Sequence, residues 1–213
     1  ALGNNNFVIA SAYDDVNSVS NAGSVMLING ATGAQIGTTR VGDNTNDFFG
    51  SAWITSLGNN NFVIASRWDD VNSVTDVGSV MLINGATGAQ IGTTRVGDNA
   101  SDQLGYSSVT ALGNNNFVIA SAYDDVNSVT NSGSVMLING TTGAQIGTIL
   151  AGDATSDRLG VSSVTALGNN NFVIASQTDD VNGVNDAGSV MLVNGATGAQ
   201  IGTTLAGNTA SDQ

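Results

Sequence analysis

The sequence contains no cysteine, proline, histidine, lysine or glutamate, and these absences exclude several classes of chemistry. Without cysteine the chain forms no disulfides and no thiolate metal sites, and it is compatible with an oxidising or a reducing compartment. The missing side chains also include the usual general bases, thiol nucleophiles and Schiff-base amines. We therefore expect that the protein is not an enzyme.

Charge of positive sign is scarce. The chain has 4 basic residues, all arginine, against 17 acidic residues, all aspartate, and its net charge is −13. Such a chain is repelled by nucleic acid and by anionic membranes, so we expect neither as a partner. No apolar run approaches the ~18 residues of a membrane span. The surface of Asn, Ser, Thr, Gly and Asp favours an extracellular or cell-surface location.

A repeat of 55 residues organises the whole chain. The segment Leu-Gly-Asn-Asn-Asn-Phe-Val-Ile-Ala-Ser begins at Leu2, Leu57, Leu112 and Leu167. This gives one array, 1–213, with repeats 2–56, 57–111, 112–166 and a truncated 167–213. Because the chain opens in the middle of a repeat, we expect a segment of a longer protein, or a chain whose open ends another copy completes.

Within one repeat, four short β-branched or apolar runs alternate with turn-rich segments. In the third repeat these runs are Ser107 to Leu112, Phe117 to Ala120, Ser134 to Ile138 and Gln145 to Ile149. The turns between them are rich in Gly and Asn, and Asn139-Gly140 is a strong hairpin signal. No stretch has the 3.6-residue apolar period of a helix. The pattern predicts four strands per repeat.

Four strands in 55 residues are typical of a propeller blade. The second and third runs are apolar on both faces, so a single sheet needs a like sheet pressed against it. We therefore expect an all-β fold of β-propeller-type blades, each with four antiparallel strands, in four tandem repeats. The alternative is a β-solenoid or a stack of open sheets.

The repeat also resembles the FG-GAP repeat of integrin-alpha-type β-propellers, in its bacterial form. Three pairs take the place of the Phe-Gly motif: Phe49-Gly50, Leu104-Gly105 and Leu159-Gly160. Three triplets take the place of the Gly-Ala-Pro motif: Ala65-Ser66-Arg67, Ala120-Ser121-Ala122 and Ala175-Ser176-Gln177. The opening of the third strand is matched by 21–25 and 186–190. The resemblance implies a propeller. Two departures stand out: the loop Gly58 to Asn61, where that family often binds calcium, has no carboxylate, and four repeats replace the usual seven blades.

Paired aspartates are the strongest candidates for a ligand site, because carboxylate and amide oxygens suit calcium. The calcium candidates are Asp14, Asp15, Asn17, Asp69, Asp70, Asn72, Asp124, Asp125, Asn127, Asp179, Asp180 and Asn182. A second group lies in the linkers: Asp43, Asp47, Asp98, Asp102, Asp153 and Asp157. The alternative for both groups is architectural, since Asp and Asn also cap turns by bonding to nearby backbone N–H groups.

Aromatic side chains at the loop entrances are candidates for ligand stacking. Tyr13, Trp68 and Tyr123 would form such a rim, although aromatic residues beside strand ends more often pack against a neighbouring sheet. Near-identical repeats, open ends and unreactive side chains favour a structural or adhesive extracellular protein that associates with itself or with neighbouring repeats. The alternative is a multivalent module that binds glycans or surface proteins, with or without calcium.

Overall fold

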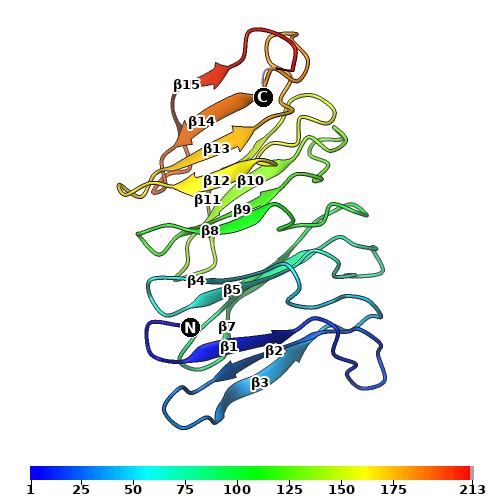
Figure 1. Cartoon of the computed structure of the whole chain (residues 1–213), viewed down its shortest axis with the longest axis vertical. Coiled ribbons are helices and arrows are strands. Elements are labelled where there is room, and N and C mark those ends of the chain that lie inside the picture. The colour runs from blue at the N-terminus through cyan, green and yellow to red at the C-terminus, as the bar shows by residue number, and fades with distance from the viewer. Residues whose placement is uncertain (212–213) are drawn as a thin grey trace. The chain divides into compact units, whose positions relative to one another are not determined.

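The computed structural model describes residues 1–211, and all of its regular structure there is β-strand (Figure 1). The strands are β1 (Phe7–Ser11), β2 (Ser24–Ile28), β3 (Gln35–Val41), β4 (Trp53–Ser56), β5 (Phe62–Ser66), β6 (Ser79–Ile83), β7 (Gln90–Val96), β8 (Ser108–Ala111), β9 (Phe117–Ser121), β10 (Ser134–Ile138), β11 (Gln145–Ala151), β12 (Ser163–Ala166), β13 (Phe172–Ser176), β14 (Ser189–Val193) and β15 (Gln200–Ala206). Within these residues, no helix has the length and hydropathy to cross a bilayer.

The strands form four open antiparallel sheets. Each of the last three sheets begins with a strand (β4, β8 or β12) that lies at the end of the preceding sequence repeat as bounded above, so from here on a repeat means one sheet together with the turn that leads into its first strand. Three sheets have four strands, in the orders β4-β5-β6-β7, β11-β10-β9-β8 and β12-β13-β14-β15. The first sheet has the order β1-β2-β3 and therefore three strands. The prediction of four antiparallel strands per repeat is confirmed for the second, third and fourth repeats, and none of the sheets closes on itself.

Two compact units contain these sheets. The first comprises Ala1–Gly105 with Gly140–Gly143, and the second comprises Tyr106–Asn139 with Ala144–Gln213. The first unit thus holds the sheets of repeats one and two, and the second unit holds those of repeats three and four.

In the third repeat the predicted strands agree with the structure to within one residue at each end, except for the fourth strand, which is longer. The sequence predicts it over Gln145 to Ile149, and it runs over Gln145–Ala151. A register shift between Val135 and Leu137 of the partner strand marks a β-bulge, and Gly147 has a φ of +71° there. The bulge absorbs extra residues and lets the pairing continue to Ser134↔Ala151.

In the first unit, two sheets pack face to face through alternate side chains. Val25 and Leu27 of β2 meet Phe62 and Ile64 of β5, and all four are at most 4% exposed. Residues of a strand point alternately to opposite faces. We call the face that carries Val25 and Leu27 the exit face of a repeat, and the face that carries Phe62 and Ile64 the entry face.

The second unit repeats this arrangement. Val135 and Leu137 on the exit face of the third repeat pack against Phe172 and Ile174 on the entry face of the fourth. Within each unit, therefore, a repeat lies face to face with its successor, as the apolar runs predicted. Each buried Phe or Ile side chain contributes roughly 1.5–3 kcal/mol relative to an exposed one.

Asparagine side chains add polar contacts between neighbouring sheets. The side-chain amides of Asn4 and Asn6 both donate to the Gly85 carbonyl, at 3.0 and 2.8 Å. In the second unit, Asn114 and Asn116 donate to the Gly195 carbonyl at 3.0 and 2.9 Å. The Asn run that predicted a turn therefore also ties each turn to the hairpin of the following repeat.

The first and last repeats leave one apolar face uncovered. On the entry face of the first repeat, Phe7 is 37% exposed and Ile9 41% exposed. On the exit face of the fourth repeat, Val190 is 40% exposed and Leu205 68% exposed. Isolated exposed apolar side chains are ordinary, but Phe7, Ile9 and Val190 occupy positions that are buried between repeats elsewhere, and Leu205 occupies one that is half-buried there.

Candidate functional site

The second aspartate of each pair holds its own loop. Asp15, Asp70 and Asp180 each accept the backbone N–H of the residue six positions later, at 2.7 Å, and Asp125 does so at 2.6 Å. The asparagine two residues beyond each aspartate has a positive φ of 52–55°, a conformation that asparagine tolerates in turns. These bonds are the capping that Asp and Asn provide in tight loops.

The first aspartate of each pair points into the protein where a repeat precedes it. Asp69 is 6% exposed and Asp179 is 8% exposed, whereas Asp14 in the first repeat is exposed. The Oδ2 atom of Asp69 accepts a hydrogen bond from the Ser79 hydroxyl, and Asp14 accepts one from Ser24 at 2.6 Å. A serine at the start of the third strand thus orients this carboxylate.

A linker aspartate joins each loop to the repeat before it. Asp47 is fully buried and accepts the N–H groups of Asp43 and Asn44, at 2.9 and 2.7 Å. Its other oxygen accepts the N–H of Asp70 in the next repeat, at 3.2 Å. In the second unit, Asp157 accepts the N–H groups of Ala154 at 2.6 Å and of Asp180 at 3.1 Å.

These contacts gather carboxylates from two repeats into one place. Oxygens of Asp43, Asp47 and Asp69 lie within 4.8 Å of one another, and so do those of Asp153, Asp157 and Asp179. We call these the aspartate clusters. The sequence predicts the paired and the linker aspartates as two separate groups of ligand candidates, and the structure brings members of both groups together.

Burial makes the charged form of these carboxylates costly. It raises the pKa of Asp69 from 3.8 to about 6, with the nearby Asp47 and Asp43 charges adding to the effect and the Ser79 hydrogen bond opposing it. Burial also raises the pKa of Asp47, against the three backbone N–H groups that favour its ionised form. In the second unit burial raises the pKa of both Asp157 and Asp179 in the same way.

Each aspartate cluster borders a surface hollow. In the first unit, Asp43, Asp69, Asp70 and Asn72 are among the residues that line a hollow of 520 Å³. The corresponding hollow of the second unit has 270 Å³ and is lined in part by Asp153, Asp179, Asp180 and Asn182. Oxygen ligands of this kind suit a hard cation such as calcium, which takes six to eight of them.

The rim aromatics lie in separate environments. Tyr13 is 78% exposed and meets Phe48 edge to face, with ring centroids 5.4 Å apart. Trp68 lies under the Arg67 guanidinium, at 4.9 Å, and borders a hollow of 400 Å³ with Phe48. Tyr123 meets Tyr106 edge to face at 4.7 Å and has Arg158 at 5.5 Å from its ring. Each aromatic residue therefore packs against a different local partner.

Comparison with known proteins corrects the FG-GAP resemblance. A family model described as a repeat of unknown function (DUF5650) matches residues 1–51, 56–106, 111–160 and 166–213, and no FG-GAP repeat is found. The search of curated proteins gives no match.

The shared motifs have a structural origin that explains the error. Gly50, Gly105 and Gly160 have φ values of +80 to +82° and sit against a Val and an Ala side chain of the preceding repeat. A hydrophobic residue followed by glycine is therefore what the packing of these sheets requires, and it is too short a pattern to identify a family. The family model matches four copies of its repeat over nearly the whole sequence, and the chain therefore belongs to the DUF5650 repeat family.

Proposed function

We propose that the chain is a non-enzymatic structural or adhesive repeat protein of the cell exterior, which associates with other repeats of its own kind. The observation that carries this proposal is the state of the end faces. Phe7 and Ile9 are 37% and 41% exposed, whereas their counterparts Phe62 and Ile64 are 2% and 1% exposed. The uncovered faces have the same residues as the faces that pack between repeats.

The two end faces are complementary. The exit face of the last repeat carries Val190, the counterpart of Val25, and the entry face of the first carries Phe7, the counterpart of Phe62. Inside the first unit, Val25 and Phe62 belong to one core. Contact between different faces of like units adds repeats in one direction, and it builds an open filament, as in a sheath or a fibre, where the rotation from copy to copy does not close a ring. The association is thus proposed through sheet faces, together with the open strand edges.

Sedimentation velocity over a wide concentration range tests this proposal. We expect the weight-average sedimentation coefficient to rise with concentration, and the double variant Phe7→Ser and Ile9→Thr to abolish the rise. The control is Ile149→Thr, because Ile149 is 43% exposed and threonine occupies the same place in the other three repeats. A wild-type chain that stays monomeric throughout would contradict the proposal.

We also propose that the sheets are arranged as propeller-type blades. Face-to-face packing of a repeat on its successor within each unit supports this arrangement. Small-angle scattering distinguishes the arrangements, because radially arranged sheets and a linear stack differ in their longest dimension.

A second candidate function is multivalent binding of glycans or surface proteins, with calcium at the aspartate clusters. The observation in its favour is that the clusters border hollows at the same place in both units. Calcium should then raise the unfolding temperature of the wild-type chain, and Asp69→Asn with Asp179→Asn should remove that rise. Glycan binding and calcium titrations that both show no change would eliminate this candidate and leave the clusters as architecture.

A further inference from the structure

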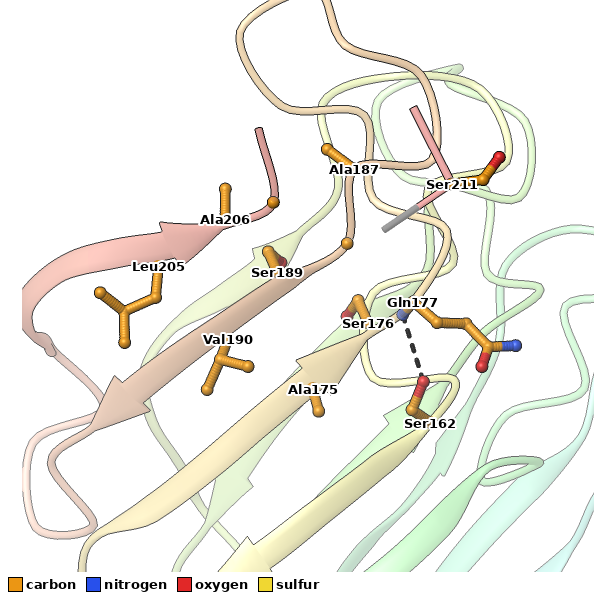
Figure 2. Close-up of a pocket in the computed structure, with 12 residues that line it drawn as sticks. Ser162, Ala175, Ser176, Gln177, Ala187, Ser189, Val190, Leu205, Ala206 and Ser211 are labelled. Carbon is orange, nitrogen blue, oxygen red and sulfur yellow. Dashed lines mark hydrogen bonds between the residues drawn. The ribbon is translucent and has the colours of Figure 1, made fainter. Parts of the chain in front are cut away.

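The exit face of the last repeat contains a groove. It has a volume of 710 Å³, and its lining includes Ala175, Ala187, Val190 and Leu205. Figure 2 shows Ala175, Val190 and Leu205 on the neighbouring strands β13, β14 and β15, with Ala187 and Ser189 at the loop end. The volume lies in the range of pockets that bind ligands.

The same groove is filled in the other repeats. A hydrophobic residue and a glycine occupy it each time, as Phe49-Gly50, Leu104-Gly105 and Leu159-Gly160. The three hydrophobic residues are only 1–2% exposed. We call these three pairs the turn segments.

Backbone hydrogen bonds fix each turn segment in its groove. The N–H of Phe49 donates to the Ala22 carbonyl at 2.9 Å, and the N–H of Leu159 donates to the Ser132 carbonyl at 2.9 Å. The residues before them, Phe48 and Arg158, donate in the same way to the carbonyls one position earlier. In the last repeat the matching acceptor is the carbonyl of Ala187, which lines the groove.

The glycine of each turn segment has a φ of +80 to +82°, and a side chain there would crowd its neighbours. A Cβ atom added to Gly160 would come within 3.0 Å of Val135 Cγ2 and 3.2 Å of Ala120 Cβ. One added to Gly105 would come within 3.1 Å of both Val80 Cγ2 and Ala65 Cβ. In the last repeat the corresponding pair is Val190 and Ala175, and both line the groove.

We propose that this groove is a docking site for the hydrophobic-glycine turn segment of a further repeat of the same family. All three turn segments of residues 1–211 already sit in their own grooves, so none of them is available to it. The occupant must supply a large apolar side chain, two backbone N–H donors and a glycine with a positive φ. That combination distinguishes it from a generic apolar ligand.

This inference rests on the proposed function, because it treats the exit face as the place where another repeat docks. It differs in naming the segment that the other repeat must contribute. A second copy stacked through Phe7 and Ile9 covers part of the exit face, while its own turn segments remain buried. Occupancy of the groove and self-association of the chain are therefore separate measurements.

The test extends the full chain after Gln213 by Leu-Gly-Val-Ser-Ser, the sequence of Leu159 to Ser163. We expect the methyl NMR signals of Val190 and Ala175 to shift and the unfolding temperature to rise. The matched control carries Leu-Ala-Val-Ser-Ser, whose alanine lacks the φ freedom of glycine and meets the Val190 side chain. It should lose both effects.

Acetylated peptides that begin one residue earlier, Arg-Leu-Gly-Val-Ser-Ser and Arg-Leu-Ala-Val-Ser-Ser, carry both N–H donors and are then added to the unextended chain. We expect the glycine peptide to bind with a Kd on the order of 1 mM, since two residues bury little surface, and the alanine peptide to bind at least about tenfold more weakly. Val190→Thr should weaken binding of the glycine peptide, whereas Ile149→Thr, outside the groove, should not. Equal shifts with both peptides, or none with either, would overturn the inference.

The result separates this inference from the proposed function. Groove binding by a chain that sediments as a monomer supports the docking site and contradicts self-association. Concentration-dependent association without any response of Val190 to the extension does the reverse.

Discussion

The pentapeptide Phe-Val-Ile-Ala-Ser forms the second strand in every repeat, and its surroundings differ between the first and second repeats. In β5 all five residues are buried, whereas in β1 four are exposed and one is half-buried. Both strands pair with their neighbours in the same register. The local sequence therefore sets the strand and the alternation of faces, while the repeat before it and the outer strand beside it, both of which β1 lacks in the described residues, supply the burial.

The largest expected effect comes from removing the same side chain at both places. Phe62→Ala should lower the free energy of unfolding by about 3–5 kcal/mol, because it opens a cavity between two packed sheets. Phe7→Ala removes a side chain that is already 37% exposed, and it should cost less than about 1 kcal/mol. Urea unfolding followed by tryptophan fluorescence measures both. Equal costs would mean that the first repeat is covered in solution.

Glycines at one outer-strand position give a second comparison. Gly147 and Gly202 have φ values of +71° and +72°, so alanine is strained at both. A Cβ on Gly147 would also come within 2.7 Å of the Thr197 carbonyl oxygen, whereas one on Gly202 meets nothing within 4 Å. We expect Gly202→Ala to cost about 1 kcal/mol and Gly147→Ala about 2–4 kcal/mol.

Thermal unfolding of these two variants provides the measurement. Since φ is nearly the same at the two positions, the difference between them isolates the contact with the following repeat. If Gly202→Ala is as damaging as Gly147→Ala, the backbone strain alone accounts for the effect and the close approach contributes nothing.

The buried Asp69 of the second repeat should make the stability of the protein depend on pH. The pKa of Asp69 is raised from 3.8 to about 6, so the folded state binds its proton more tightly than the unfolded state does. Its contribution to stability is then present below about pH 4 and is lost as the pH rises through about 6. Asp69→Asn should therefore stabilise the protein at pH 7, by about 1–3 kcal/mol, and should have little effect at pH 3.5.

Asp14→Asn is the matched control, because Asp14 occupies the same place in the first repeat, bonds to the same serine and is exposed. Denaturant unfolding at several pH values gives the difference between each variant and the wild type. A gain for Asp69→Asn that is the same at pH 3.5 and pH 7 would show that its charge is not the cause.

The strand pattern and the need for a covering sheet could be predicted from the sequence, because both follow from the local run of side chains. The run Phe117 to Ala120 is apolar at every position, and such a run requires cover on both faces. The aspartate clusters could not be predicted in this way. Asp47 and Asp69 are 22 positions apart, and they meet only because the linker folds back onto the next loop, where Asp47 accepts the N–H of Asp70. The recurrence of this spacing every 55 residues was the available signal.

The groove of the last repeat shows a further limit of the sequence. Val25, Val80, Val135 and Val190 stand in the same pentapeptide, so nothing local separates them. The first three are 1–3% exposed and the fourth is 40% exposed, because the described residues place neither a turn segment nor a following sheet over the fourth. The identity of the side chain predicts what it can contact, and the neighbouring repeat decides whether the contact exists.

The smallest expected effect concerns the asparagine contacts between repeats. Asn6 donates to the Gly85 carbonyl of the next repeat, whereas Asn171, at the same place in the last repeat, accepts the N–H of Gly195 in its own repeat at 3.3 Å. Asn6→Ala should lower the free energy of unfolding by about 1 kcal/mol, the net value of one buried hydrogen bond, because Asn4 still satisfies the carbonyl. Asn171→Ala should cost about 0.5 kcal/mol or less.

Amide hydrogen exchange at Asn84 to Ala89 checks the origin of the difference, since only Asn6→Ala should raise exchange in that hairpin. Unchanged exchange there would assign the cost to the turn of the first repeat alone.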